Sequence, residues 1–294
     1  MSRANGLLVA IVAMLFHSSL SVAFDQTHAK WGAVLGRYRA QDGRIHYKVF
    51  KDAVDSGKET DFKSYLSEMA SVSWTEFSSW SSNDRMAFLI NAYNAFTVQL
   101  VLQHYPVESI KKIGGLFGSP WKKSFFSLVD GKIKSLDAIE HEYLRKIYKN
   151  PLIHAAINCA SLSCPPIMGR PFSGKELEKQ LEDIFKSFLA DPFRNRFEPK
   201  SGKLFLSEIF KWFGEDFKEK YSGYLNAIER FGPAAARDAI KAGGKVEWID
   251  YDWTLNDADT KETIQYAIAK RIWLTAPLPF LTIGRQIKYD IRKF

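Results

Sequence analysis

The strongest constraint on the fold is one long segment, residues 84–104, which is apolar on nearly every side of a helix. Ser81 and Asp84 can cap its start, and Pro106 stops it at the other end. Such a helix offers no polar face to water. We therefore expect it to be buried at the centre of the molecule.

The same helix carries three polar side chains, Asn91, Tyr93 and Asn94. Asn91 and Asn94 are three residues apart and share one face. Buried amides need hydrogen-bond partners. The two asparagines therefore either clamp the backbone of neighbouring loops, which is the simpler interpretation, or line a binding site together with Tyr93.

Candidate strands are few and short, which indicates an α+β fold. The chain has 294 residues, 46% of them hydrophobic, and is long enough to bury one large core. We expect the buried central helix to pack on a small, mainly antiparallel sheet with helices around it. The strand candidates are residues 122–134, 152–158, 197–206 and 245–253.

Residues 1–23 have the three parts of a secretory signal peptide: a positive charge at Arg3, an apolar run over residues 6–16, and small residues at 21–23. The apolar run is shorter than a membrane-spanning helix needs. We therefore expect export to a bacterial periplasm or an extracellular space, with no integral membrane span after cleavage. A single domain is expected over residues 24–256, followed by a C-terminal helix and basic tail over residues 257–294.

The net charge of +8 is spread along the chain, with no run of five or six basic residues. Export and the absence of basic-aromatic motifs argue against nucleic acid as a partner. A weak contact between the basic tail and an anionic surface remains an expectation. Glycines at 114, 115 and 118 lack the spacing of a nucleotide loop, and we expect no cofactor.

Both cysteines of the chain, Cys159 and Cys164, lie where a short apolar run ends in a small, polar loop stopped by prolines. An oxidising compartment favours a disulfide, and this short bridge would constrain the fold little. A free thiol at either position would instead indicate function. His154 lies five residues before Cys159, so their side chains can meet only if the chain turns sharply after Asn158.

One hypothesis is a thiol-dependent hydrolase or transferase that acts on an amide or thioester. Cys159 would be its nucleophile and His154 its base. Glu140 or Asn91 would orient the imidazole ring.

A second hypothesis is a non-catalytic periplasmic binding protein, in which Cys159 and Cys164 form a structural disulfide. A cleft around Tyr93, Asn94 and His154 would then take a small-molecule or peptide-like ligand.

The third hypothesis is a thiol-redox or zinc site, because His154, Cys159 and Cys164 are donor types that suit zinc. Their spacing matches no standard zinc motif, and His141 would have to supply a fourth ligand, so we predict no metal. The simplest interpretation requires none of these three hypotheses: His154 is a hydrogen-bonded core histidine, and the two cysteines form a structural disulfide.

Five stretches together resemble the family known as domain of unknown function 547. They are residues 88–95, 139–145, 154–166, 209–217 and 251–256. The family is defined without an established activity, so the resemblance implies a shared fold over most of residues 60–256 and no particular substrate. A central helix followed by a His-bearing strand is similar to papain- and transglutaminase-like thiol enzymes, although there the nucleophilic Cys begins the helix and here the helix has no Cys.

Overall fold

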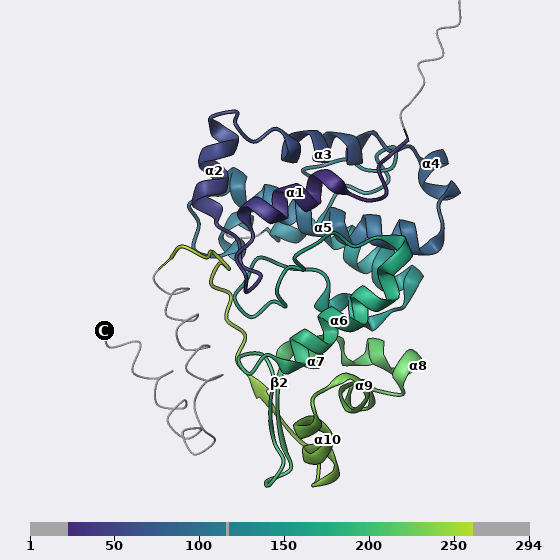
Figure 1. The fold of residues 1–294 in the computed structure, drawn as a ribbon, viewed down its shortest axis with the longest axis vertical. Helices are drawn as coiled ribbons and strands as arrows, with labels where there is room; N and C mark the ends of the chain where they lie inside the picture. The colour runs from purple at the N-terminus through teal and green to yellow at the C-terminus, as the bar shows by residue number, and fades with distance from the viewer. Residues whose placement is uncertain (1–22, 116–117, 261–294) are drawn as a thin grey trace, which may run out of the picture.

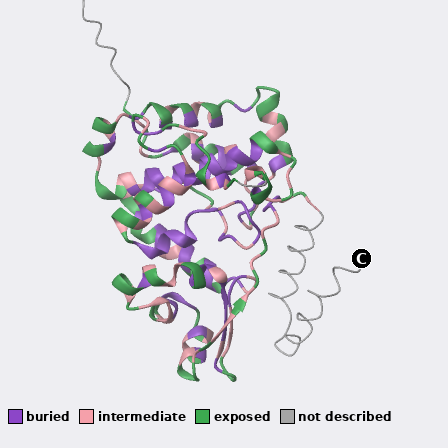
Figure 2. Ribbon diagram, turned by 180° about the vertical axis from the view of Figure 1, so that it is seen from behind, coloured by how far each residue is buried: buried purple, intermediate pink, exposed green. Residues whose placement is uncertain are grey.

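The computed structural model describes residues 23–115 and 118–260, and its central element is the helix α5 (Ser82–His104). The side chain of Ser81 caps it by accepting a hydrogen bond from the backbone N–H of Asp84, at 3.1 Å. Nearly every residue from Met86 to Leu102 is buried. The prediction of a buried central helix is confirmed, and Figure 2 shows α5 as a band of buried residues through the fold.

Helices of the N-terminal part cover one side of α5 (Figure 1). Here α1 packs on α3, while α2 and α3 both contact α5. These elements are α1 (Ala29–Tyr38), α2 (Tyr47–Asp55), α3 (Asp61–Ser71) and α4 (Trp74–Ser79).

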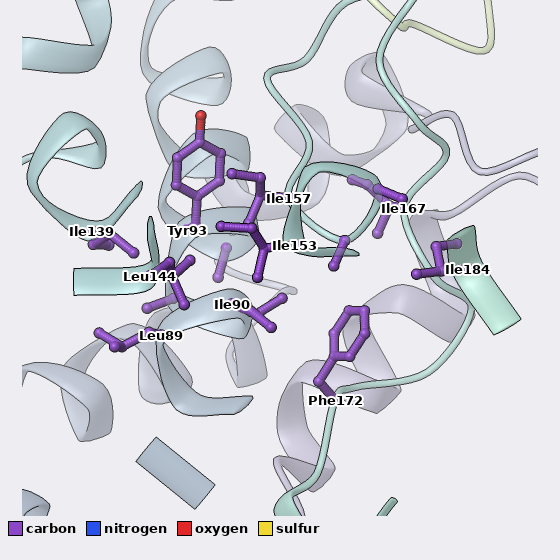
Figure 3. Packing of buried hydrophobic residues seen from close by; sticks show 14 of the residues in the cluster. Leu89, Ile90, Tyr93, Ile139, Leu144, Ile153, Ile157, Ile167, Phe172 and Ile184 are labelled. Carbon is purple, nitrogen blue, oxygen red and sulfur yellow. The ribbon is translucent and has the colours of Figure 1, made fainter. Parts of the chain in front are cut away.

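The other side of α5 meets short helical turns and the π-helix η3. Contacts run from α5 to η3 and η5, and from η4 to α6. Figure 3 shows side chains of this region, including Leu89, Ile90 and Tyr93 of α5, Ile139 and Leu144 of η3, and Ile153, Ile157 and Phe172. The elements are η1 (Ile110–Gly114), η2 (Pro120–Lys122), η3 (Ala138–Tyr148), η4 (Pro151–Ala155), η5 (Gly174–Glu176) and α6 (Leu177–Ala190).

A small mixed sheet and short helices form the end of the molecule farthest from α1–α4 (Figure 1). The strands β1 (Arg196–Glu198), β2 (Lys203–Ser207) and β3 (Lys245–Ile249) lie in the order β1-β2-β3, with β1 antiparallel and β3 parallel to β2. The helical elements between β2 and β3 are α7 (Glu208–Phe213), η6 (Gly214–Asp216), α8 (Phe217–Tyr221), α9 (Tyr224–Phe231) and α10 (Ala234–Lys241).

The α+β class is confirmed, and antiparallel pairing is the commoner kind among the strand pairs and isolated bridges of the described residues. Two features differ from expectation. The sheet contacts α7 and α10, whereas α5 is surrounded by helical elements. The strand at residues 245–253 is shorter than expected, because β3 ends at Ile249.

The predicted strand at residues 152–158 is wrong, because Pro151–Ala155 form a 3₁₀ turn. Asn150 caps it by accepting a hydrogen bond from the Leu152 N–H, and Pro151 occupies a first-turn position that suits its fixed φ angle. A short apolar run that is buried on every side has no periodicity to separate strand from helix. The strand candidate at residues 122–134 is reduced to a turn with one bridge, Leu128 to Ile133.

After β3 the chain returns to the centre of the domain. Leu255 bridges Ser161, and Asp257 bridges Ile45. Asp257 is fully buried and accepts a hydrogen bond from the Tyr105 hydroxyl at 2.8 Å. Packing with the domain therefore continues past residue 256.

Two sequence predictions fall largely or wholly outside the described residues: the signal peptide at 1–23 and the C-terminal helix with its basic tail. Within residues 23–115 and 118–260, no helix is both long enough and apolar enough to cross a membrane.

Loss of the Asn94 amide should destabilise the fold, because Asn94 donates to the Ala156 carbonyl at 2.9 Å and accepts from the Asn158 N–H at 2.8 Å. Asn94→Ala leaves both backbone groups without this partner, and we expect a loss of about 2–4 kcal/mol in the free energy of unfolding. Urea denaturation of the full chain measures it. The control is Asn226→Ala, at an exposed position, which should stay within about 0.5 kcal/mol of wild type; equal effects of the two variants would contradict the clamp.

Candidate functional site

A cavity of about 200 Å³ brings together six side chains that the sequence singled out: Tyr93, Glu140, His141, His154, Cys159 and Cys164. They come from α5, η3, η4 and the cysteine loop, defined here as residues 158–166. The other lining residues are Ser119, Trp121, Asp137, Ile157, Pro165, Ile209, Trp212, Phe213, Tyr251 and Trp253. This cavity, called the central pocket below, is our candidate site.

A second hollow, of about 500 Å³, lies beside Arg39, Met168 and Asp191. None of the residues that the sequence singled out lines it, so the chemistry of the chain points to the central pocket.

Glu140 is the group in the central pocket whose protonation is best matched to neutral pH. It lies on η3, a π-helix, a rare type of turn that is frequent at functional sites. Burial raises the pKa of its carboxyl to about 7. A hydrogen bond with Tyr93 acts to lower the same pKa, but burial outweighs it. Glu140 can therefore hold or release a proton near neutral pH, as a general acid or base must.

His154 is fixed by a chain of charged groups. Its Nε2 lies 2.8 Å from Oδ2 of Asp216, and its ring stacks on Phe213 with the centroids 4.2 Å apart. Asp216 also accepts two hydrogen bonds from the Arg145 guanidinium, at 2.6 and 2.8 Å. The imidazole is thus held in one orientation by a carboxylate, as the sequence hypothesis required.

The carboxylate partner of His154 is a residue that the sequence analysis did not select. We expected Glu140 or Asn91 in this role, and the structure places Asp216 there. Asp216 belongs to residues 209–217, one of the family-like stretches, and that was the available signal. Spacing alone could not reveal the pair, because 62 residues separate Asp216 from His154.

Opposing effects set the two pKa values of this pair. Burial acts to raise the pKa of Asp216, but the hydrogen bonds from Arg145 and His154 outweigh it and hold that pKa well below its usual range. Burial lowers the pKa of His154, although Asp216 favours the charged ring. Asp216 is therefore ionised. It lies between the Arg145 guanidinium and the ring of His154, which resists protonation.

Cys159 and Cys164 form a disulfide, one of the two alternatives that the sequence left open. Cys164 is buried, and Cys159 is partly exposed. The Tyr251 hydroxyl donates to Cys164 Sγ at 3.1 Å and accepts from the Ser161 hydroxyl at 3.0 Å. The expected nucleophile is therefore bonded in this state, and both cysteines are among the lining residues of the pocket.

Asn91 and Asn94 do not line the central pocket. Asn91 holds Phe172 through both backbone groups, donating to its carbonyl at 2.7 Å and accepting from its N–H at 3.0 Å. Asn94 holds Ala156 and Asn158 in the same manner. Both asparagines clamp backbone, as in the simpler interpretation, and of the three polar side chains singled out on α5 Tyr93 alone lines the pocket.

Aromatic side chains form one wall of the central pocket. Trp212 is 41% exposed and lies 5.9 Å from Trp253 and 4.8 Å from Tyr251, between ring centroids. Trp121 packs edge-on against Trp253 at 5.7 Å. Exposed, flat apolar faces beside buried polar groups are typical of ligand sites.

A metal site finds no support in the part of the chain that the structure describes. There, no group of three or more His, Cys, Asp or Glu residues is placed to hold an ion. His141, the suggested fourth zinc ligand, has its Nδ1 3.1 Å from the Arg145 guanidinium.

Replacing Glu140 with Gln should change how stability depends on pH. The folded protein holds the Glu140 proton up to a pKa of about 7, against an ordinary value of 4.5. The folded state therefore binds more protons between these values, and the free energy of unfolding falls as pH rises through this window. From pH 4.5 to pH 8, Glu140→Gln should gain on the order of 2–3 kcal/mol relative to wild type.

Urea denaturation across this pH range measures the difference between Glu140→Gln and wild type. Glu142→Gln, at an exposed position of the same helix, is the control and should follow the wild-type curve. A constant offset between Glu140→Gln and wild type at every pH would contradict a raised pKa.

One family model matches a part of the chain. No curated protein and no solved structure matches the chain significantly. The matched segment, residues 77–189, includes α5, η3 and the cysteine loop, while Asp216, Trp212 and Tyr251 lie beyond it. Over residues 77–189 the chain matches the family described as "Protein of unknown function, DUF547", and the resemblance seen in the sequence is confirmed there.

Proposed function

We propose that the chain is an exported protein, periplasmic or secreted, that binds a small or peptide-like ligand in the central pocket. The observation that carries the proposal is the placement of Glu140, a carboxyl with a pKa of about 7, in the same cavity as the exposed face of Trp212. The carboxyl can donate or accept a hydrogen bond, and the apolar face can stack on a ring. The two groups together specify a ligand.

Export is supported by two observations. Residues 1–23 have the pattern of a secretory signal peptide. The Cys159–Cys164 bridge is of a kind that persists in oxidising compartments outside the cytosol.

The volume of the pocket limits the size of the ligand. Pockets for drug-sized molecules range from about 300 to 1,000 Å³, and this cavity measures about 200 Å³. One ring or one side chain of a peptide-like ligand fits this space. Trp212 and Trp253 would stack on its flat face, and Glu140 with Tyr93 would bond its polar end.

Binding can be tested by tryptophan fluorescence with N-acetyl amino acid amides as probes, one for each side-chain type. We expect saturable fluorescence changes with a subset of the probes, with a Kd of about 1 mM. This Kd corresponds to a binding free energy of about −4 kcal/mol. Trp212→Ala should weaken that binding about tenfold or more, because it removes the exposed face of the wall. Trp74→Ala, on α4 and also exposed, is the matched control and should keep wild-type affinity. Unchanged binding by Trp212→Ala, or no response to any probe, would refute the proposal.

A second candidate function is thiol-dependent hydrolysis or transfer on an amide or thioester, after the bridge is opened. The specific observation in its favour is that Cys159, His154 and Glu140 all line one cavity. His154 has its orienting carboxylate in Asp216, which completes the usual order of nucleophile, base and orienter.

This candidate can be tested without a reductant, because Cys164→Ala frees the Cys159 thiol. We expect Cys164→Ala to hydrolyse the benzyl thioester of N-acetylglycine at least about 100-fold faster than Cys159→Ala, which keeps a thiol at the buried position. Spectroscopic release of benzyl mercaptan gives the rate. Equal rates in the two variants would exclude Cys159 as a nucleophile.

A further inference from the structure

The cysteine loop is held in place by many contacts other than its disulfide. The Asn158 side chain donates to the Pro165 carbonyl at 2.7 Å, and so spans the same stretch as the bridge. Buried Arg194 donates to the carbonyls of Cys164 and Leu162, at 2.6 and 2.7 Å. A bridge between residues five apart also removes little chain entropy. The fold therefore has little need of this disulfide.

Backbone contacts to the returning C-terminal segment restrain the loop further. The N–H of Leu162 donates to the Thr254 carbonyl at 2.8 Å, and the N–H of Asn256 donates to the Ala160 carbonyl at 3.1 Å. Opening the sulfur–sulfur bond would leave these contacts intact.

The two sulfur atoms are not equivalent. Cys164 is 3% exposed, whereas Cys159 is partly exposed, and both line the central pocket. A thiolate that enters the pocket reaches Cys159 Sγ with less obstruction. Access is one of the factors that decide which sulfur of a disulfide is attacked.

The sulfur that would leave in such an attack already has hydrogen-bond donors. The backbone N–H of Cys159 donates to Cys164 Sγ at 2.9 Å, and the Tyr251 hydroxyl donates to the same atom at 3.1 Å while lying 3.3 Å from Cys159 Sγ. Burial raises the pKa of Tyr251, so its hydroxyl keeps the proton that it donates. Donors of this kind stabilise a thiolate, and a more stable thiolate leaves faster.

We propose that the Cys159–Cys164 bridge is a thiol–disulfide exchange site for a small peptide thiol. The incoming thiolate attacks Cys159 Sγ and forms a mixed disulfide there. The Cys159–Cys164 bond breaks, and its electron pair stays on Cys164 Sγ as a thiolate. A second thiol attacks the mixed disulfide, forms the oxidised peptide disulfide and releases Cys159 as a thiolate, so that two electrons pass to the protein. This reaction does not depend on the ligand proposed above.

The first experiment compares the two single-cysteine variants of the full chain with oxidised glutathione as the probe. Cys164→Ala leaves the accessible thiol and Cys159→Ala leaves the buried one. We expect Cys164→Ala to form its mixed disulfide at least about tenfold faster than Cys159→Ala does. Mass spectrometry of acid-quenched samples measures both rates. Equal rates, or faster reaction of Cys159→Ala, would overturn the assignment of Cys159 as the attacked sulfur.

The second experiment tests the leaving group in the protein with its bridge intact. Tyr251→Phe removes the hydroxyl and keeps the ring, so reduction by glutathione should slow about tenfold, the usual effect of losing one hydrogen bond to a charged group. Tyr224→Phe is the control, at a ring that contacts Phe210 and Trp248, and should react as wild type does. An unchanged rate in Tyr251→Phe would refute stabilisation of the Cys164 thiolate.

Two further measurements separate exchange from a structural role. The double variant Cys159→Ala/Cys164→Ala should keep the wild-type urea midpoint, and wild-type protein should be reduced by glutathione without denaturant. A large drop in the midpoint, or reduction only after unfolding, would make the bridge structural and end the proposal. Neither result bears on the fluorescence test of ligand binding.

Discussion

The hydrogen bonding of the two buried asparagines of α5, Asn91 and Asn94, is the constraint on which the rest of the structure depends. A helix that is enclosed on all sides cannot leave Asn91 and Asn94 without partners, because an unpaired buried amide costs several kcal/mol. Both side chains bond to the backbone of segments that approach α5, at Phe172 and at residues 156–158. The same bonds that satisfy the helix therefore fix the start of the cysteine loop and, with it, one side of the central pocket.

Burial also gives the pocket its chemistry. Removal of the carboxyl of Glu140 from water moves its pKa to about 7, where an exposed Glu would be fully ionised. Asp216 is less deeply buried and has Arg145 and His154 beside it, so it stays ionised. Two carboxyls that line or border one cavity thus differ in charge at neutral pH, and this difference separates a proton donor from a fixed anion.

The disulfide occupies an unusual position for a structural bridge, because it lies at a pocket wall in a loop that hydrogen bonds already hold. Its two sulfurs differ in burial and in the backbone donor: Cys164 is buried and accepts from the Cys159 N–H, whereas Cys159 is partly exposed. The Tyr251 hydroxyl lies near both, at 3.1 Å from Cys164 Sγ and 3.3 Å from Cys159 Sγ. We propose that the oxidation state of this bridge decides which groups the pocket offers. With the bridge closed, aromatic faces and Glu140 are available for binding; with the bridge open, a thiol would be added to them.

The sequence by itself determined the buried helix, the α+β class, the cysteine pair and the polar candidates Tyr93, Glu140 and His154 of the pocket, because hydrophobic pattern and residue chemistry are local properties. It could not assign residues 152–158, since an apolar run that is buried on all sides lacks periodicity. Only the tertiary structure paired Asp216 with His154, brought Trp212 and Tyr251 to the pocket, and assigned Asn91 and Asn94 to clamping backbone. These contacts join residues 62 to 81 positions apart, and the spacing of side chains along a chain carries no information about such distances in space.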